Sequence, residues 1–92
     1  MATMLEVMKE RLPEGLEVVK AKQRNGASQT VIDFRYDGTE VKAYLQNVCS
    51  PGMVEKNCDF TITAAMLSIA LLRDDLAMAM EWKEKQDRVL AI

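Results

Sequence analysis

The chain has 92 residues, of which 49% are hydrophobic and 28% are charged, and it contains no histidine. This length and balance are typical of one small folded domain spanning residues 1–92 rather than of a disordered segment. Twelve basic residues against fourteen acidic ones exclude a protein that holds nucleic acid by bulk positive charge. Because histidine is the commonest general acid–base and metal ligand, we expect neither an enzyme nor a metal or other cofactor.

The first predicted element is a short helix over residues 2–12, where apolar residues recur at helical spacing. Thr3 is the expected N-cap, and Glu6 three residues later completes the pattern of a capping box. Pro13 ends this helix, because proline cannot continue the helical hydrogen-bond ladder.

Residues 16–48 predict three antiparallel strands. Asp37-Gly38, between two alternating runs, favours a two-residue type I′ turn and therefore sets the register of the last two strands. One face then pairs Tyr36 with Thr39, Phe34 with Val41, Ile32 with Ala43 and Thr30 with Leu45, and the other pairs Arg35 with Glu40, Asp33 with Lys42 and Val31 with Tyr44. The first face is nearly all apolar and the second joins opposite charges, so both faces favour this register.

The first strand is expected over residues 16–24, followed by a turn near residues 25–26. Because burial of charge is unfavourable, we expect Val19 and Ala21 on the core side and Lys20 on the opposite face. That opposite face also receives apolar residues, namely Val18, Val31, Tyr44 and Val48.

Residues 49–60 are expected to connect the sheet to the last helix, either as a plain crossover, which we favour, or as a functional loop. Ser50-Pro51-Gly52-Met53 fits a type II turn, with proline and glycine at the two central positions. Cys49 and Cys58 are expected to be free thiols, because a metal site or a catalytic thiolate needs partners that this chain lacks.

Residues 61–88 predict one long helix, capped by Asp59 or by one of the two threonines that follow it. One apolar stripe contains Ile62, Ala65, Met66, Ile69, Leu72, Leu76 and Met80, and a second contains Ala64, Leu67, Leu71, Met78 and Trp82. A helix on a sheet buries one stripe, so we expect free apolar surface near Met78 and Trp82.

These elements predict an α+β domain of order α-β-β-β-α, with both helices on one face of a three-stranded antiparallel meander.

The longest apolar stretch, residues 64–72, is far shorter than the ~20 residues that cross a bilayer. Charged residues interrupt the N-terminal segment, which therefore does not resemble a signal peptide. We expect a cytoplasmic protein.

The candidate partner-binding residues fall into a basic, an acidic and an apolar group. They are Lys20, Lys22, Arg24 and Asn25 near a hairpin tip, Asp74 and Asp75 in the last helix, and Met53, Met78 and Trp82. The basic group suits phosphates or an acidic protein surface, although lysines also protect edge strands from pairing. The acidic group suits a basic partner or marks a polar break, and the apolar group either touches a partner or fills the core.

The element order is similar to that of double-stranded RNA-binding domains, whose second helix starts with a lysine cluster that grips phosphates. The corresponding start here, residues 61–65, contains no basic residue. The resemblance therefore implies the fold and not that mode of RNA binding.

In size, mild acidity, element order and lack of catalytic motifs, the chain resembles small phage proteins that disable host defence, anti-CRISPR proteins in particular. The resemblance implies a stoichiometric inhibitor that docks on a CRISPR–Cas surveillance complex, such as a type I complex, and blocks target DNA binding. The basic group would then contact the guide RNA or a Cas subunit, and Asp74 and Asp75 would meet basic residues.

Two alternatives remain open. One is a homodimeric adaptor or chaperone-like protein, with Leu67, Leu71, Met78 and Trp82 forming the seam between the two copies. The other is a weak RNA-binding module that uses the basic hairpin.

Overall fold

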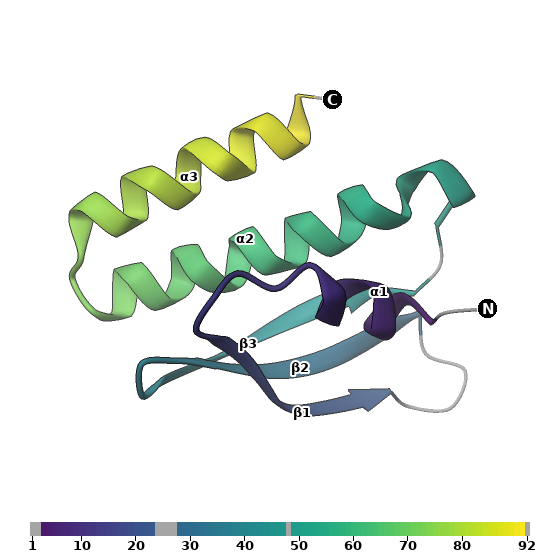
Figure 1. Ribbon diagram of the computed structural model, residues 1–92, viewed down its shortest axis with the longest axis horizontal. Helices are drawn as coiled ribbons and strands as arrows, with labels where there is room; N and C mark the ends of the chain where they lie inside the picture. Colours follow the sequence, from purple (N-terminus) through teal and green to yellow (C-terminus); the bar gives the residue numbers. More distant parts are fainter. Residues whose placement is uncertain (1–2, 24–27, 48, 92) are drawn as a thin grey trace.

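The computed structural model describes residues 3–23, 28–47 and 49–91, and it confirms the predicted α+β class and element order (Figure 1). The elements are α1 (Met4–Glu10), β1 (Leu16–Gln23), β2 (Gln29–Tyr36), β3 (Thr39–Gln46), the 3₁₀ helix η1 (Pro51–Met53), α2 (Val54–Leu72) and α3 (Leu76–Leu90). The strands form one antiparallel sheet in the order β1-β2-β3. The single long C-terminal helix of the prediction is in fact two helices, α2 and α3.

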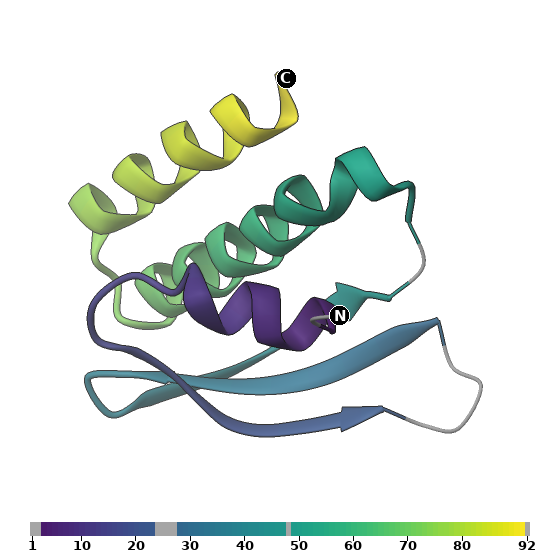
Figure 2. The ribbon, with the colours of Figure 1, turned by 45° about the vertical axis from the view of Figure 1, so that its right-hand side comes forward.

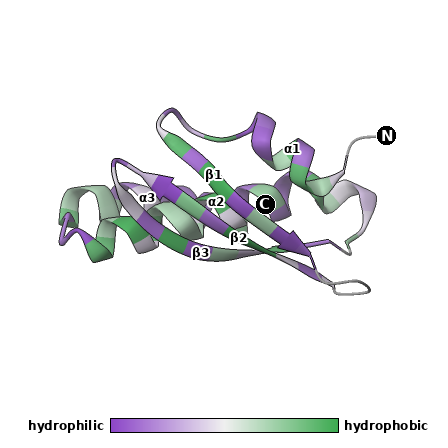
Figure 3. Cartoon of the chain, turned by 90° about the horizontal axis from the view of Figure 1, so that it is seen from below, coloured by the Kyte–Doolittle hydropathy of each residue, from purple (hydrophilic) through white to green (hydrophobic). Residues whose placement is uncertain are grey.

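The elements stack in three layers (Figure 1). Helices α1 and α2 lie beside each other over one face of the sheet, and α3 packs on the far side of α2 (Figure 2). The core lies between the sheet and the first helical layer, and its largest fully buried side chains are Met8, Ile32, Phe34, Leu45, Cys58, Met66 and Ile69. No described element covers the opposite face of the sheet, which is the face seen in Figure 3.

The two best-defined local predictions are confirmed. Strands β2 and β3 have the predicted register throughout. Asp37 and Gly38 have φ angles of 46° and 81°, the left-handed values that a type I′ turn needs at both central positions. At the N-terminus of α1, the side chains of Thr3 and Glu6 form the predicted capping box.

Strand β1 departs from the predicted alternation because it contains a β-bulge. Its register with β2 shifts between Val18 and Lys20, which leaves Val19 as an extra residue. Val18 consequently packs against the core and Val19 is 45% exposed, so the prediction was wrong for both residues. Beyond the bulge the alternation is as predicted, with Lys20 paired to Asp33 on the uncovered face and Ala21 packed against the core.

The connection after β3 is shorter than predicted, because α2 begins at Val54 rather than near residue 61. Proline is tolerated in a first helical turn, so Pro51 starts η1, and the N–H of Met53 donates to the carbonyl of Ser50 at 2.8 Å. Gly52 is not among the residues with positive φ, so the predicted type II turn was wrong. Asp59, one of the expected caps, lies inside α2 instead.

The predicted long helix is broken by a turn around Asp74. Asp74 has a left-handed φ of 52°, and its N–H donates to the carbonyl of Leu71 at 3.2 Å. The N–H of Asp75 donates to the carbonyl of Ala70 at 2.9 Å, which completes a Schellman-type helix end. The Asp75 side chain then accepts from the N–H of Met78 at 3.1 Å and caps α3. Apolar spacing continues across this turn, and for that reason periodicity alone predicted one helix.

Because α3 folds back on α2, the residues of the two apolar stripes are not buried and exposed as predicted. Trp82 is only 9% exposed and belongs to the core, and Met78 packs against it. The expectation of free apolar surface at these two residues was therefore wrong. Four of the exposed apolar side chains lie instead at or near the turn between α2 and α3, and they are Leu71, Leu72, Leu76 and Met80.

Candidate functional site

The uncovered face of the sheet carries most of the charged strand residues. Every second residue of each strand points to it, apart from the shift at the bulge. These residues are Glu17, Lys20 and Lys22 of β1, Gln29, Val31, Asp33 and Arg35 of β2, and Glu40, Lys42, Tyr44 and Gln46 of β3. Val48, also expected on this face, lies outside the described residues. Figure 3 shows the resulting alternation of hydrophilic and hydrophobic positions along the strands.

Near the β2–β3 turn, the charges on this face neutralise one another. Arg35 lies between two glutamates, with Nη2 3.0 Å from Glu17 Oε2 and Nη1 3.9 Å from Glu40 Oε2. All three side chains are well exposed, so these pairs order the surface more than they stabilise the fold. With two glutamates against one arginine, this end of the face carries no excess positive charge.

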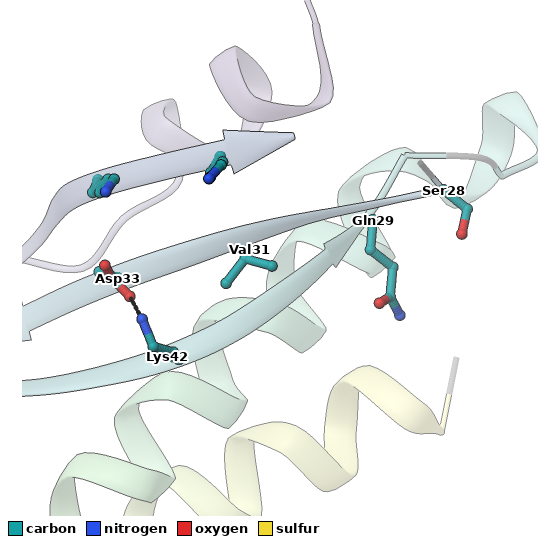
Figure 4. A pocket seen from close by; sticks show the side chains of 7 residues that line it. Ser28, Gln29, Val31, Asp33 and Lys42 are labelled. Carbon is teal, nitrogen blue, oxygen red and sulfur yellow. Dashed lines mark hydrogen bonds and ion pairs between the residues drawn. The ribbon is translucent and has the colours of Figure 1, made fainter. Parts of the chain in front are cut away.

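The other end is a shallow hollow with an excess of positive charge. Its volume is about 490 Å³, and it is lined by Lys20, Lys22, Ser28, Gln29, Val31, Asp33 and Lys42. Figure 4 shows Asp33 of β2 and Lys42 of β3 pointing toward each other, with Val31 further along β2. Lys42 Nζ lies 2.7 Å from Asp33 Oδ1, and this hydrogen bond raises the pKa of Lys42. Lys42 therefore stays protonated near neutral pH and donates to Asp33.

Lys20 and Lys22 supply the remaining positive charge of the hollow. Both side chains are exposed, and neither forms an ion pair within residues 3–23, 28–47 and 49–91. Their ammonium groups consequently remain available to carboxylates or phosphates of a partner. The hollow can bind an anionic group, while the half-buried Val31 side chain that lines it offers a small apolar contact.

The structure does not bring the three predicted groups of binding residues together. Lys20 and Lys22 lie in the hollow, whereas Arg24 and Asn25 lie outside the described residues. Met53 is exposed in η1, and Met78 and Trp82 pack inside the chain. Asp74 and Asp75 lie at the turn between α2 and α3, where they shape the helix ends.

Two charged residues of the hollow, Lys42 and Asp33, were missing from the predicted binding groups. Lys42 and Asp33 were placed opposite each other by the predicted register, but only as a stabilising pair. The sequence also predicted Lys20 on the same face of the sheet as Asp33 and Lys42, so the three predicted strands together indicated a basic region on this face.

The two cysteines are free thiols, as predicted. Cys58 is fully buried, and its Sγ lies 3.7 Å from the carbonyl oxygen of Met4. Burial, assisted by the charge of Asp59, raises the pKa of Cys58 to about 11, so its thiol stays protonated near neutral pH. A protonated, buried thiol is a poor nucleophile. Within the described ranges, no group of three or more His, Cys, Asp or Glu residues could hold a metal ion.

Comparisons of the chain with known protein families, with curated proteins and with solved structures found no match. In the part of the chain that the structure describes, no helix is long and apolar enough to span a membrane. The functional proposal therefore rests on the surfaces described above.

Proposed function

We propose that this chain is a non-enzymatic binding module that docks on a larger protein or ribonucleoprotein complex through the uncovered face of its sheet. The observation that supports the proposal is the basic hollow, where Lys20 and Lys22 have no ion-pair partner among the described residues. Positive charge concentrated on one face of a chain of net charge −2 suits an acidic partner surface.

A protein surface fits this hollow better than naked nucleic acid. Affinity for nucleic acid grows with the number of neutralised phosphates, and two unpaired lysines neutralise few. The acidic chain as a whole also repels a polyanion at long range. RNA binding through this face is therefore the weaker alternative, and it predicts a strong dependence on salt.

The narrower proposal is a phage-type inhibitor that docks on a type I CRISPR–Cas surveillance complex and blocks target DNA binding. Its support is the resemblance in size, acidity and element order, together with a charged surface suited to docking. It is tested by measuring target DNA binding of the purified complex with and without the chain. Unchanged DNA binding at saturating amounts of the chain would reject this narrower version.

The broader proposal is tested by affinity capture of the tagged chain from its host, with and without nuclease. The double variant Lys20→Ala, Lys22→Ala is compared with Lys9→Ala, Lys83→Ala, which removes the same charge from helices α1 and α3. We expect a stoichiometric, nuclease-resistant complex that the first double variant weakens about tenfold and the control leaves intact. Equal effects of the two double variants, or loss of all partners with nuclease, would contradict the proposal.

A further inference from the structure

Strand β3 forms an edge of the sheet and borders a groove against helix α2. The groove has a volume of about 300 Å³. Its sheet wall includes Lys42, Tyr44 and Gln46, and its helix wall includes Phe60, Ala64 and Ser68. Phe60 is 43% exposed, so the helix wall presents apolar surface directly beside the edge strand.

The geometry of the hairpin determines which backbone groups of β3 face this groove. In a two-residue hairpin, the residues that flank the turn form a hydrogen-bonded pair, here Tyr36 with Thr39. From Thr39 onward, every second residue of β3 therefore directs its N–H and C=O toward β2. The residues in between direct theirs to the free edge, and they are Glu40, Lys42, Tyr44 and Gln46.

Two observed hydrogen bonds agree with this assignment. The N–H of Asn47 donates to the carbonyl of Ser28 at 2.8 Å, on the side of β2. On the opposite side, the Thr61 hydroxyl of α2 donates to the carbonyl of Tyr44 at 3.0 Å. That carbonyl keeps a second lone pair. In the described ranges, the outward N–H groups of Lys42 and Tyr44 have no hydrogen-bond partner.

The two edges of the sheet differ in how they are protected against pairing. Strand β1 carries a bulge at Val19, which discourages the addition of another strand. Strand β3 keeps a regular register along its whole length, without a bulge or a proline. Among the described residues, Thr61 bonds to the outward carbonyl of Tyr44, and the other outward backbone groups remain a template for a further strand.

We propose that the groove between β3 and α2 binds an extended segment of a partner polypeptide, which pairs with β3 as a fourth strand. Side chains of an added strand alternate between the two faces of the sheet. One set would contact Phe60 and Ala64, and the other would lie near Lys42 on the uncovered face. The segment that fits best therefore alternates apolar and acidic residues.

A lone extended segment suits this groove better than a second copy of the chain. A second copy would bring its own α2 to the same edge and crowd the helix wall at Phe60 and Ser68. The groove borders the hollow of the docking proposal and shares Gln29 and Lys42 with it, but it does not include Lys20 or Lys22, so substitutions of these two lysines separate the two sites.

The test uses a synthetic peptide of alternating valine and glutamate, eight residues long like β3. Binding is followed by fluorescence anisotropy and by amide hydrogen exchange at Lys42 and Tyr44. We expect slower exchange of both amides, and a weaker effect from a peptide N-methylated at every second residue. The double variant Lys20→Ala, Lys22→Ala should bind the peptide within about threefold of wild type, which separates this site from the hollow.

Substitutions identify the backbone contact. Tyr44→Pro removes an outward N–H and leaves the ladder to β2 intact, whereas Tyr44→Ala changes the same side chain and keeps the N–H. We expect about tenfold weaker binding for Tyr44→Pro than for Tyr44→Ala. Phe60→Ser, on an exposed position of α2, should also weaken binding about tenfold without affecting the sheet.

Several outcomes would overturn the inference. They are no binding of the alternating peptide at about 1 mM, equal binding of the N-methylated peptide, and equal affinities of wild type, Tyr44→Pro and Phe60→Ser. A wild-type dimer in sedimentation that Tyr44→Pro converts to monomers would show that a second copy occupies the edge instead.

Discussion

Arg11, the C-cap of α1, donates two parallel hydrogen bonds to Asp59 of α2, from Nε to Oδ1 at 2.8 Å and from Nη2 to Oδ2 at 2.7 Å. The hydrogen bond to Asp59 raises the pKa of Arg11. Because α1 is short, this bidentate contact and the burial of Met8 together fix how α1 lies against α2.

We expect Arg11→Lys to lower the free energy of unfolding by about 1 kcal/mol. Lysine replaces the planar guanidinium, which donates two hydrogen bonds, with a single ammonium group on a flexible side chain. Urea denaturation measures the change. In an Asp59→Asn background the same substitution should cost clearly less, because the charged partner is gone. Equal costs in the two backgrounds would show that the contact does not couple the helices.

The turn between α2 and α3 offers a pair of opposite predictions. Asp74→Gly should stabilise the fold by about 0.5–1 kcal/mol, because glycine adopts the φ of 52° without strain. Asp75→Ala should destabilise it by about 1 kcal/mol, because the cap on the N–H of Met78 is lost. Thermal unfolding measures both changes, with Asp74→Ala as the control that keeps the strain.

These two aspartates were also candidates for contact with a basic partner. Asp74→Gly separates that role from the structural one, because it removes the charge while favouring the turn. If the captured complex survives this substitution, the role of Asp74 is structural. If the complex weakens while the fold is stabilised, Asp74 contacts the partner.

Trp82→Ala should lower the free energy of unfolding by about 3 kcal/mol, because it leaves a cavity between α2 and α3. Met80→Ala, on the same helix but 65% exposed, should change it by less than about 0.5 kcal/mol. Urea denaturation compares the two. A Trp82→Ala protein of unchanged stability but smaller mass in solution would instead support the homodimer with Trp82 in its seam.

The buried thiol of Cys58 predicts a specific dependence of stability on pH. Its pKa is raised from 9.0 to about 11 in the folded state, so the folded chain binds this proton more tightly than the unfolded chain. The resulting stabilisation is complete below pH 9 and is lost as the pH rises toward 11. The cost of Cys58→Ala, measured by urea denaturation, should therefore shrink across this range. A constant cost would show that the thiol does not titrate abnormally.

Much of the sheet and of the basic hollow follows from local chemistry. Asp37-Gly38 determines the hairpin turn, and with it the partners of every residue in β2 and β3, including Asp33 with Lys42. The capping box of Thr3 and Glu6 locates the start of α1 in the same way. These features depend on residues close in sequence, or on the strict alternation of a strand, and were therefore predictable.

Only the tertiary structure decided how the C-terminal half packs and which surfaces it leaves open. The apolar spacing is the same for one long helix and for two, and burial of Trp82 against the core stabilises the folded-back arrangement. A long-range contact holds the end of α2 over the hairpin, with Arg73 Nη2 2.9 Å from Asp37 Oδ2. The bulge at Val19 likewise depends on β2 as its neighbour. These features depend on residues that are far apart in the chain. No local sequence pattern shows that such residues are close together in space.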